Sequence, residues 1–207
     1  YAAREITFGS DLDLVALARE GQAEPATRLV RNLQKWMRYT RPPRMTWEVD
    51  LRLRPHGDDG PLASSTSALA RYFDGGGAQF WERMAYSRAR VIGGAPELAE
   101  GFEALRQDRV LGAPVTAEDL ASIGEMRRRI ENEKAPDSRE GIHLKAGRGG
   151  LVDIEFLCQR YLLTHSEGFD GVVPLSASRL LSRLAEMSIL PQADAERLRE
   201  DYEFLRG

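Results

Sequence analysis

Two short segments with alternating polar and apolar residues constrain the fold of this chain most. Residues 9–14 read Gly-Ser-Asp-Leu-Asp-Leu, so in an extended strand Asp11 and Asp13 point to one side and the leucines to the other. Residues 48–54 read Glu-Val-Asp-Leu-Arg-Leu-Arg and alternate in the same way, with Asp50 on the polar face. If the two strands are neighbours, three carboxylates meet at one edge of a sheet.

Carboxylates that lie this close repel one another unless a cation neutralises them or one keeps its proton. Mg²⁺ prefers oxygen ligands and is commonly held by one or two carboxylates together with substrate phosphates. Two such ions would clamp the attacking and leaving oxygens of a nucleotidyl transfer. We therefore predict Asp11, Asp13 and Asp50 as catalytic and metal-binding residues of an Mg²⁺-nucleotide site. The alternative is a strand face that simply contacts solvent.

Four further residues near these acids are candidates for nucleotide binding. Gly9 and Ser10 are small and would form a turn next to the phosphates. Arg52 and Arg54 share the face of Asp50, and guanidinium groups bind phosphate oxygens well. The same two arginines would also serve to neutralise the acids of an empty site.

A glycine-rich segment, residues 145–150, precedes a helix that we expect to begin near Leu151. The free N–H groups and the dipole of a helix N-terminus favour anions, so Lys145 is a further nucleotide-binding candidate. Asp153 and Glu155 fall in the first turn of the helix, where acids complement its dipole. They are also candidates for the lining of a cleft.

Composition excludes several classes of protein. The 207 residues carry 29 basic and 32 acidic side chains, a net charge of −3, which argues against a dedicated nucleic-acid-binding surface. The single cysteine, Cys158, indicates a reducing compartment, and we expect a cytoplasmic location. The sequence has no run of 18 apolar residues and no signal-peptide pattern, so we predict neither a membrane span nor export.

The fold class predicted from these patterns is α+β: a small mixed sheet with flanking helices, followed by a mainly helical bundle. We expect strands near residues 4–8, 11–17 and 45–54, a helix over 24–39, and a turn at 55–61 that closes the sheet. Thr116 with Asp119, and Ser176, are predicted helix N-caps. The remaining helices are expected at 66–74, 79–91, 96–110, 117–134, 151–166, 176–189 and 192–206. We place a catalytic domain at 1–112 and a helical domain at 113–207.

Beyond the acids, five further stretches carry a resemblance to known proteins, and they follow one another over nearly the whole chain. They are WEVDLRLRPHG at 47–57, FWER at 80–83, SRARV at 87–91, EMR at 125–127 and KAGRGGLVDIEF at 145–156. In these motifs the chain resembles the DNA polymerase beta nucleotidyltransferase superfamily. Within that superfamily it is similar to the glutamine synthetase adenylyltransferases, bifunctional enzymes that attach and remove adenylyl groups.

The resemblance implies a reaction in which Mg-ATP supplies an adenylyl group to a tyrosine of glutamine synthetase, or in which the group is removed by phosphorolysis. Glutamine synthetase is then the protein substrate, and a nitrogen-regulatory signal protein is a candidate partner. Residues 149–155 look closer to the transferring half of the family, whereas 59–62 and 202–206 look closer to the removing half. Two other interpretations stay open: a relative that transfers uridylyl groups, and a degenerate module that binds nucleotide or protein without turnover.

One position departs from the family pattern. The superfamily carries a Gly-Gly or Gly-Ser pair shortly before its Asp-x-Asp motif, and the matching residues here are Ala2 and Ala3. Their methyl groups would narrow the approach of phosphates to the backbone. The chain begins at Tyr1, inside the motif and without an initiator methionine, so we expect it to be part of a longer protein.

Overall fold

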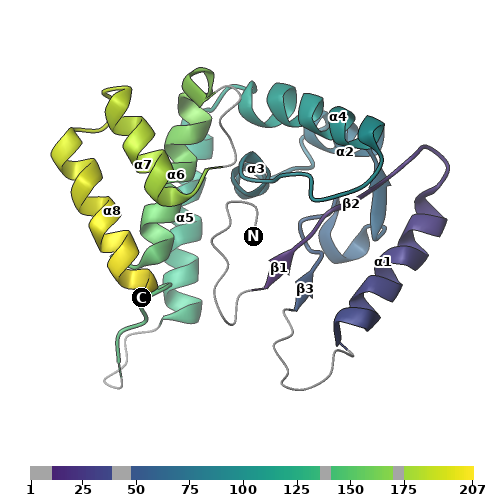
Figure 1. Cartoon of the computed structure of the whole chain (residues 1–207), viewed down its shortest axis with the longest axis horizontal. Helices are drawn as coiled ribbons and strands as arrows, with labels where there is room; N and C mark the ends of the chain where they lie inside the picture. The colour runs from purple at the N-terminus through teal and green to yellow at the C-terminus, as the bar shows by residue number, and fades with distance from the viewer. Residues whose placement is uncertain (1–10, 39–47, 136–140, 170–174) are drawn as a thin grey trace. The chain divides into compact units, whose positions relative to one another are not determined.

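A computed structural model describes residues 11–38, 48–135, 141–169 and 175–207 (Figure 1). The candidates Gly9 and Ser10, the Ala2-Ala3 pair and the strand expected at 4–8 lie outside the described residues. The chain divides into two compact units: Tyr1–Ala85 with Arg90–Arg109, and Tyr86–Ala89 with Val110–Gly207. The first unit holds all the strands of the described residues, and the second is built from helices, which agrees with the predicted α+β class.

The first unit contains two short pairs of parallel strands. β1 (Leu12–Asp13) pairs with β3 (Val49–Asp50), and β2 (Ala16–Ala18) pairs with β4 (Ala63–Ser65). Parallel strands need a crossover connection, and α1 (Ala23–Arg38) belongs to that connection and packs against β2 and β4 (Figure 1). The predicted neighbourhood of the two acidic segments is therefore confirmed.

The strands differ from the prediction in extent. The strand expected at 11–17 is divided into β1 and β2, and the one expected at 45–54 ends at Asp50. It ends there because the Asp50 carboxylate accepts the backbone N–H of Arg52 at 2.8 Å, which turns the chain. β4 was not predicted: its residues are Ala-Ser-Ser, which have little strand propensity, and it lies beyond the turn that we expected to close the sheet.

The turn after β3 is fixed by backbone geometry. His56 and Gly57 both have positive φ, and a short 3₁₀ turn, Gly57–Asp59, follows. At Gly60 an added Cβ would lie 1.9 Å from the carbonyl oxygen of Pro55, so only glycine fits. The turn brings the chain back to β4.

Three helices complete the first unit: α2 (Thr66–Asp74), α3 (Phe80–Ser87, whose last residues belong to the second unit) and α4 (Pro96–Leu105). α2 has the predicted bounds, α3 ends four residues early, and α4 passes into a wider π-helical turn, Arg106–Leu111. Leu69, Met84 and Phe102 are buried in this unit.

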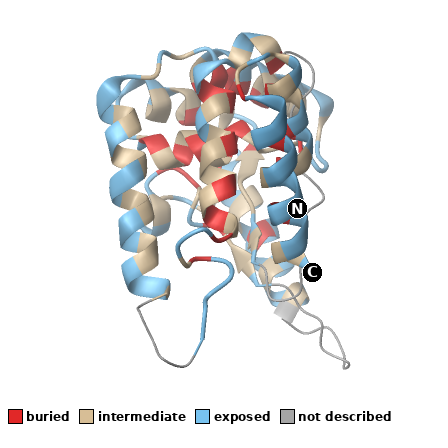
Figure 2. Cartoon of the chain, turned by 90° about the vertical axis from the view of Figure 1, so that its left-hand side faces the viewer, coloured by how far each residue is buried: buried red, intermediate tan, exposed pale blue. Residues whose placement is uncertain are grey.

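The second unit consists of α5 (Ala117–Lys134), α6 (Leu151–Thr164), a 3₁₀ turn (Ser166–Phe169), α7 (Ala177–Glu186) and α8 (Gln192–Arg206). α6 packs against α5, α7 and α8, and the buried residues follow the helix faces that meet (Figure 2). The predicted caps are confirmed, because Thr116 and Asp119 form a reciprocal capping box and the Ser176 hydroxyl accepts the N–H of Arg179.

Among the described residues, no helix is long and apolar enough to cross a membrane.

Candidate functional site

The acids of the two sequence motifs meet on β1 and β3. Asp13 stands directly opposite Asp50 in the parallel register, and the N–H groups of Leu12 and Leu14 donate to the carbonyl oxygens of Glu48 and Asp50 at 2.7 and 2.8 Å. Asp11 precedes Asp13 by two residues, and both are exposed. The backbone ladder thus fixes two of the three predicted carboxylates at corresponding positions of adjacent strands.

The two opposing acids have different electrostatic surroundings. Although Asp13 is exposed as a residue, partial loss of hydration at its carboxyl raises the pKa of Asp13, and the negative charges of Asp50 and Asp11 raise this pKa further. The pKa of Asp50 is lowered instead, chiefly by the hydrogen bonds that the Arg52 side chain donates. An excess of negative charge therefore remains at Asp13, whereas the charge of Asp50 is compensated.

Arg52 forms an ion pair with Asp50 through two of its guanidinium nitrogens. Its Nε lies 3.0 Å from Oδ1 and 2.8 Å from Oδ2, and its Nη2 donates to Oδ2 as well. The Asp50 side chain is 13% exposed and the Arg52 side chain 69%. Arg52 lies in the turn after β3, so the ion pair, and not a shared strand face, brings it to the acid.

The residue types and strand positions of Asp11, Asp13 and Asp50 fit a hard divalent cation, because all three present carboxylate oxygens from adjoining positions. The arrangement does not yet fit one. Among the described residues no three His, Cys, Asp or Glu side chains gather closely enough to hold an ion. Both oxygens of Asp50 accept hydrogen bonds from Arg52.

Arg54 has a different environment from Arg52. Its guanidinium is buried and donates to the carbonyl oxygens of Leu51 at 2.8 Å and Gly60 at 3.2 Å, with Asp58 at 3.3 Å. These bonds hold the turn after β3 together. The positive charge of Arg54 still contributes to the low pKa of Asp50, but its role in nucleotide binding stays a prediction.

The loop before α6 is closed by its own backbone. The N–H groups of Leu151 and Val152 donate to the carbonyl oxygens of Leu144 and Lys145, both at 3.0 Å, and that of Asp153 donates to Gly150. The first N–H groups of the helix are thus already hydrogen-bonded. This N-terminus therefore has fewer free N–H groups for binding an anion than the sequence predicted. Lys145 is exposed beside it.

Asp153 and Glu155 each have a partner within the second unit. Asp153 accepts the N–H of Gly149 at 2.7 Å and forms an ion pair with Arg127 of α5, whose Nη2 also donates to the Gly147 carbonyl at 2.8 Å. Glu155 accepts the hydroxyl of Tyr202 at 3.3 Å. Arg127 fastens the loop to two helices, a role that the sequence could not show because its partner follows 26 residues later.

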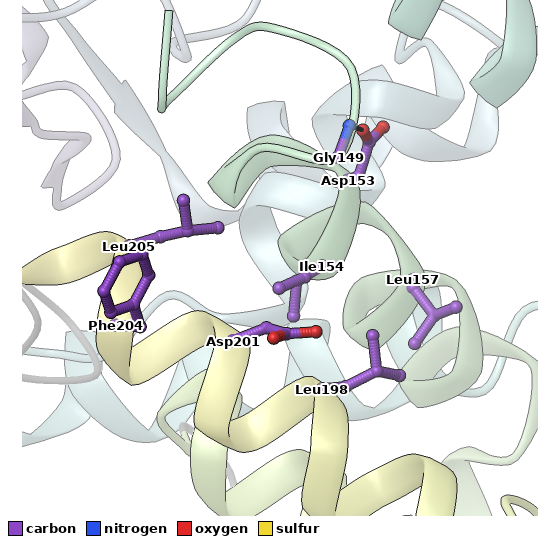
Figure 3. Close-up of a pocket in the computed structure, with 8 residues that line it drawn as sticks. All are labelled: Gly149, Asp153, Ile154, Leu157, Leu198, Asp201, Phe204 and Leu205. Atoms are coloured by element: carbon purple, nitrogen blue, oxygen red, sulfur yellow. Dashed lines mark hydrogen bonds between the residues drawn. The ribbon is translucent and has the colours of Figure 1, made fainter. Parts of the chain in front are cut away.

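An open groove of about 450 Å³ lies between α6 and α8. Figure 3 shows Gly149 and Asp153 at one end of it and mainly apolar side chains along the rest. Phe204 contributes to the groove although it is 84% exposed. Asp153 lines this groove, and its carboxylate is bound to the loop and to Arg127, whereas a role of Asp153 and Glu155 in a substrate cleft stays a prediction.

Comparison with known proteins gives two family matches. The model of the glutamate-ammonia ligase adenylyltransferase family matches residues 1–105, which include both acidic strands. The model of the PII-uridylyltransferase family matches residues 122–207, within the helical unit.

Curated relatives agree with the first match. Proteins named bifunctional glutamine synthetase adenylyltransferase/adenylyl-removing enzyme are 34% identical over 95% of this chain in Rhodopseudomonas palustris, over 98% in Thioalkalivibrio sulfidiphilus and over 100% in Mycobacterium leprae. The chain spans 21%, 22% and 20% of their respective lengths. Because the family model matches residues 1–105 and these relatives are 34% identical over nearly the whole chain, this chain belongs to the glutamate-ammonia ligase adenylyltransferase family.

Proposed function

We propose that this chain carries a nucleotidyltransferase site that moves an adenylyl group between ATP and a tyrosine hydroxyl of glutamine synthetase. The observation that carries the proposal is the register of β1 and β3, which places Asp13 opposite Asp50 in the part of the chain that the family model matches. The names of the relatives supply the acceptor protein. A nitrogen-regulatory signal protein remains a candidate regulator.

In the proposed reaction Asp11 and Asp13 would hold Mg²⁺ together with the triphosphate, and Asp50 would complete a second metal position. The bound ions would neutralise the phosphates and stabilise charge on the attacking and leaving oxygens. The tyrosine oxygen forms a bond to the α-phosphorus, the bond to pyrophosphate breaks, and Asp50 receives the hydroxyl proton. Arg52 and Arg54 would supply positive charge for the phosphates. No covalent enzyme intermediate is needed.

The reverse-acting member of the family would release the adenylyl group by phosphorolysis. Inorganic phosphate attacks the adenylyl phosphorus, the tyrosine oxygen leaves with a proton, and ADP is formed. The same three carboxylates would serve both reactions, because in each reaction one oxygen on the adenylyl phosphorus is replaced by another. Residues 149–155 favour transfer, whereas 59–62 and 202–206 favour removal.

Two rival functions are tested together with this one. The match of residues 122–207 to the PII-uridylyltransferase family favours UTP as donor and another acceptor protein. Ala2 and Ala3 in place of the glycine pair favour a module that binds without turnover.

The deciding experiment incubates the purified chain with glutamine synthetase, Mg²⁺ and ATP labelled at the α-phosphate. Label on glutamine synthetase supports transfer, and ADP formed from adenylylated enzyme and phosphate supports removal. Asp50→Asn should lose on the order of 10²-fold in kcat with an almost unchanged KM, because a positioned proton acceptor acts mainly in the transition state. Label from UTP alone, or complex formation without any transfer, would contradict the proposal.

A further inference from the structure

Arg52 occupies the carboxylate that a second metal ion would need. Its Nε contacts Oδ1 and Oδ2 of Asp50 at 3.0 and 2.8 Å, its backbone N–H reaches Oδ1 at 2.8 Å, and Nη2 donates to Oδ2. A carboxylate whose two oxygens already face a guanidinium presents few free lone pairs to a cation. Arg52 and a divalent ion therefore compete for the same acid.

The exposure of Arg52 leaves room for its side chain to move. The Arg52 side chain is 69% exposed, and within the part of the chain that the structure describes its hydrogen bonds and its ion pair are made to Asp50. Arg54 is the internal comparison: its side chain is 8% exposed and it donates to two backbone carbonyls of the turn. Arg54 therefore stabilises the turn after β3, whereas Arg52 is mostly exposed and is bound to Asp50.

Asp13 differs from Asp50 in its hydrogen bonding. It stands opposite Asp50 on the neighbouring strand, yet among the described residues none donates a hydrogen bond to its carboxylate. A cation arriving with its nucleotide thus meets Asp11 and Asp13 first. Asp50 becomes a ligand only after the guanidinium has moved.

From this arrangement we propose that Arg52 is a displaceable counter-ion of Asp50: it neutralises the acid in the absence of substrate and moves to the phosphates when the metal-nucleotide binds. This rests on the proposed function, because it concerns the same site. Arg52 acts here as a positioning residue that delays assembly of the three-carboxylate cluster. A single long side chain would then link nucleotide arrival to completion of the metal site.

The test measures Mn²⁺ binding to the whole chain by the electron paramagnetic resonance of the free ion, without nucleotide. Arg52→Gln should bind Mn²⁺ on the order of tenfold more tightly than the wild type, because the charge-assisted hydrogen bonds no longer compete. In the Asp50→Asn background the same change should have no effect. Arg52→Lys, which keeps the charge but loses the planar fork, should lie between wild type and Arg52→Gln.

A second titration with Mn-ATP separates this role from a merely structural one. Arg52→Gln should weaken nucleotide binding while it strengthens binding of the ion alone, since the guanidinium is lost from the phosphates. Arg28→Gln is the matched control, because Arg28 is an exposed arginine paired with Glu24 on α1 and should change neither titration. Circular dichroism confirms the fold of each variant, and Arg52→Lys carries the test if Arg52→Gln does not fold.

The outcomes distinguish the two proposals. Equal Mn²⁺ affinity in wild type, Arg52→Gln and Arg52→Lys, with normal Mn-ATP binding, would overturn the counter-ion role and leave the proposed function intact. Absence of Mn²⁺ and Mn-ATP binding in all folded variants would overturn the metal site, and the counter-ion role with it.

Discussion

At the scale of single residues, Asp13 and Asp50 are matched in chemistry and position but opposite in surroundings. Asp13 faces other negative charges, and Asp50 is held by Arg52. In metal-free buffer at neutral pH, Asp13→Asn should therefore raise the free energy of unfolding by up to about 1 kcal/mol, since repulsion is relieved. Urea titration measures the change. A destabilised Asp13→Asn would mean that this carboxylate has a stabilising partner.

The opposite sign is expected at Asp50. Asp50→Asn removes the charge-assisted bonds from Arg52 and weakens the acceptor that turns the chain after β3. The free energy of unfolding should fall by about 1–3 kcal/mol under the same conditions. If both asparagine variants shift stability in the same direction, the electrostatic difference between the two strands is not the one described.

Tyr72 provides a prediction about pH. Its hydroxyl donates to Glu82 at 3.0 Å, and loss of hydration together with that carboxylate raises the pKa of Tyr72 to about 12. The folded state therefore favours the neutral phenol, and this stability is complete below pH 10, the ordinary tyrosine pKa, and is lost as pH rises through 12. Tyr72→Phe should cost about 1 kcal/mol at pH 7, the scale of a lost hydrogen bond, here a partly buried one.

The measurement is the difference in urea-unfolding free energy between wild type and Tyr72→Phe from pH 8 to pH 12. Groups other than Tyr72 titrate equally in both proteins and cancel. The difference should shrink above pH 10, whereas a constant difference would show that Tyr72 ionises alike in the folded and unfolded chains.

At the scale of elements, α1 offers two adjacent apolar residues with opposite burial. Val30 is 9% exposed and faces the strands, whereas Leu29 is 70% exposed. Val30→Ala should destabilise the protein by about 1–2 kcal/mol, because it removes buried methyl groups, and Leu29→Ala by less than about 0.5 kcal/mol. Thermal unfolding measures both changes. Equal losses of stability at the two positions would show that the Leu29 side chain is packed against other residues.

α5 contains a glycine that the structure does not require. Gly124 lies inside the helix, and an added Cβ would meet nothing within 4 Å. Gly124→Ala should stabilise the protein by about 0.5–1 kcal/mol, through helix propensity and a smaller unfolded-state entropy. Gly101 of α4 is the matched control: there the Cβ would lie 3.3 Å from Thr66 Cγ2, so the gain should be smaller. Equal gains would show that the contact at Thr66 relaxes freely.

At the scale of the whole molecule, the sequence was sufficient for the elements that local chemistry defines. α2, α5 and α8 have the predicted bounds, because helical periodicity, Thr116 and flanking glycine or proline residues mark their ends. The alternating pattern also predicted the two acidic segments as strands, and the structure pairs them.

The rest depends on contacts between distant residues. β4 forms only because β2 is available as a partner, since its own residues favour no strand. Arg127 meets Asp153 through the packing of α5 on α6, and Arg52 reaches Asp50 through a turn that the carboxylate itself creates. Periodicity within one segment does not encode such pairings. The predicted division at residue 112 likewise stays a prediction.

The path of the chain between the two units limits how this protein can be recombined. It passes from one unit to the other after Ala85, after Ala89 and after Arg109, and Tyr86 and Ser87, among the most completely buried side chains, belong to the second unit. A chimera joined to a relative at a single point near residue 110 would take residues 86–89 from one parent and the rest of the second unit from the other. Shuffling between relatives should therefore succeed more often when residues 86–89 and 110–207 are inherited together.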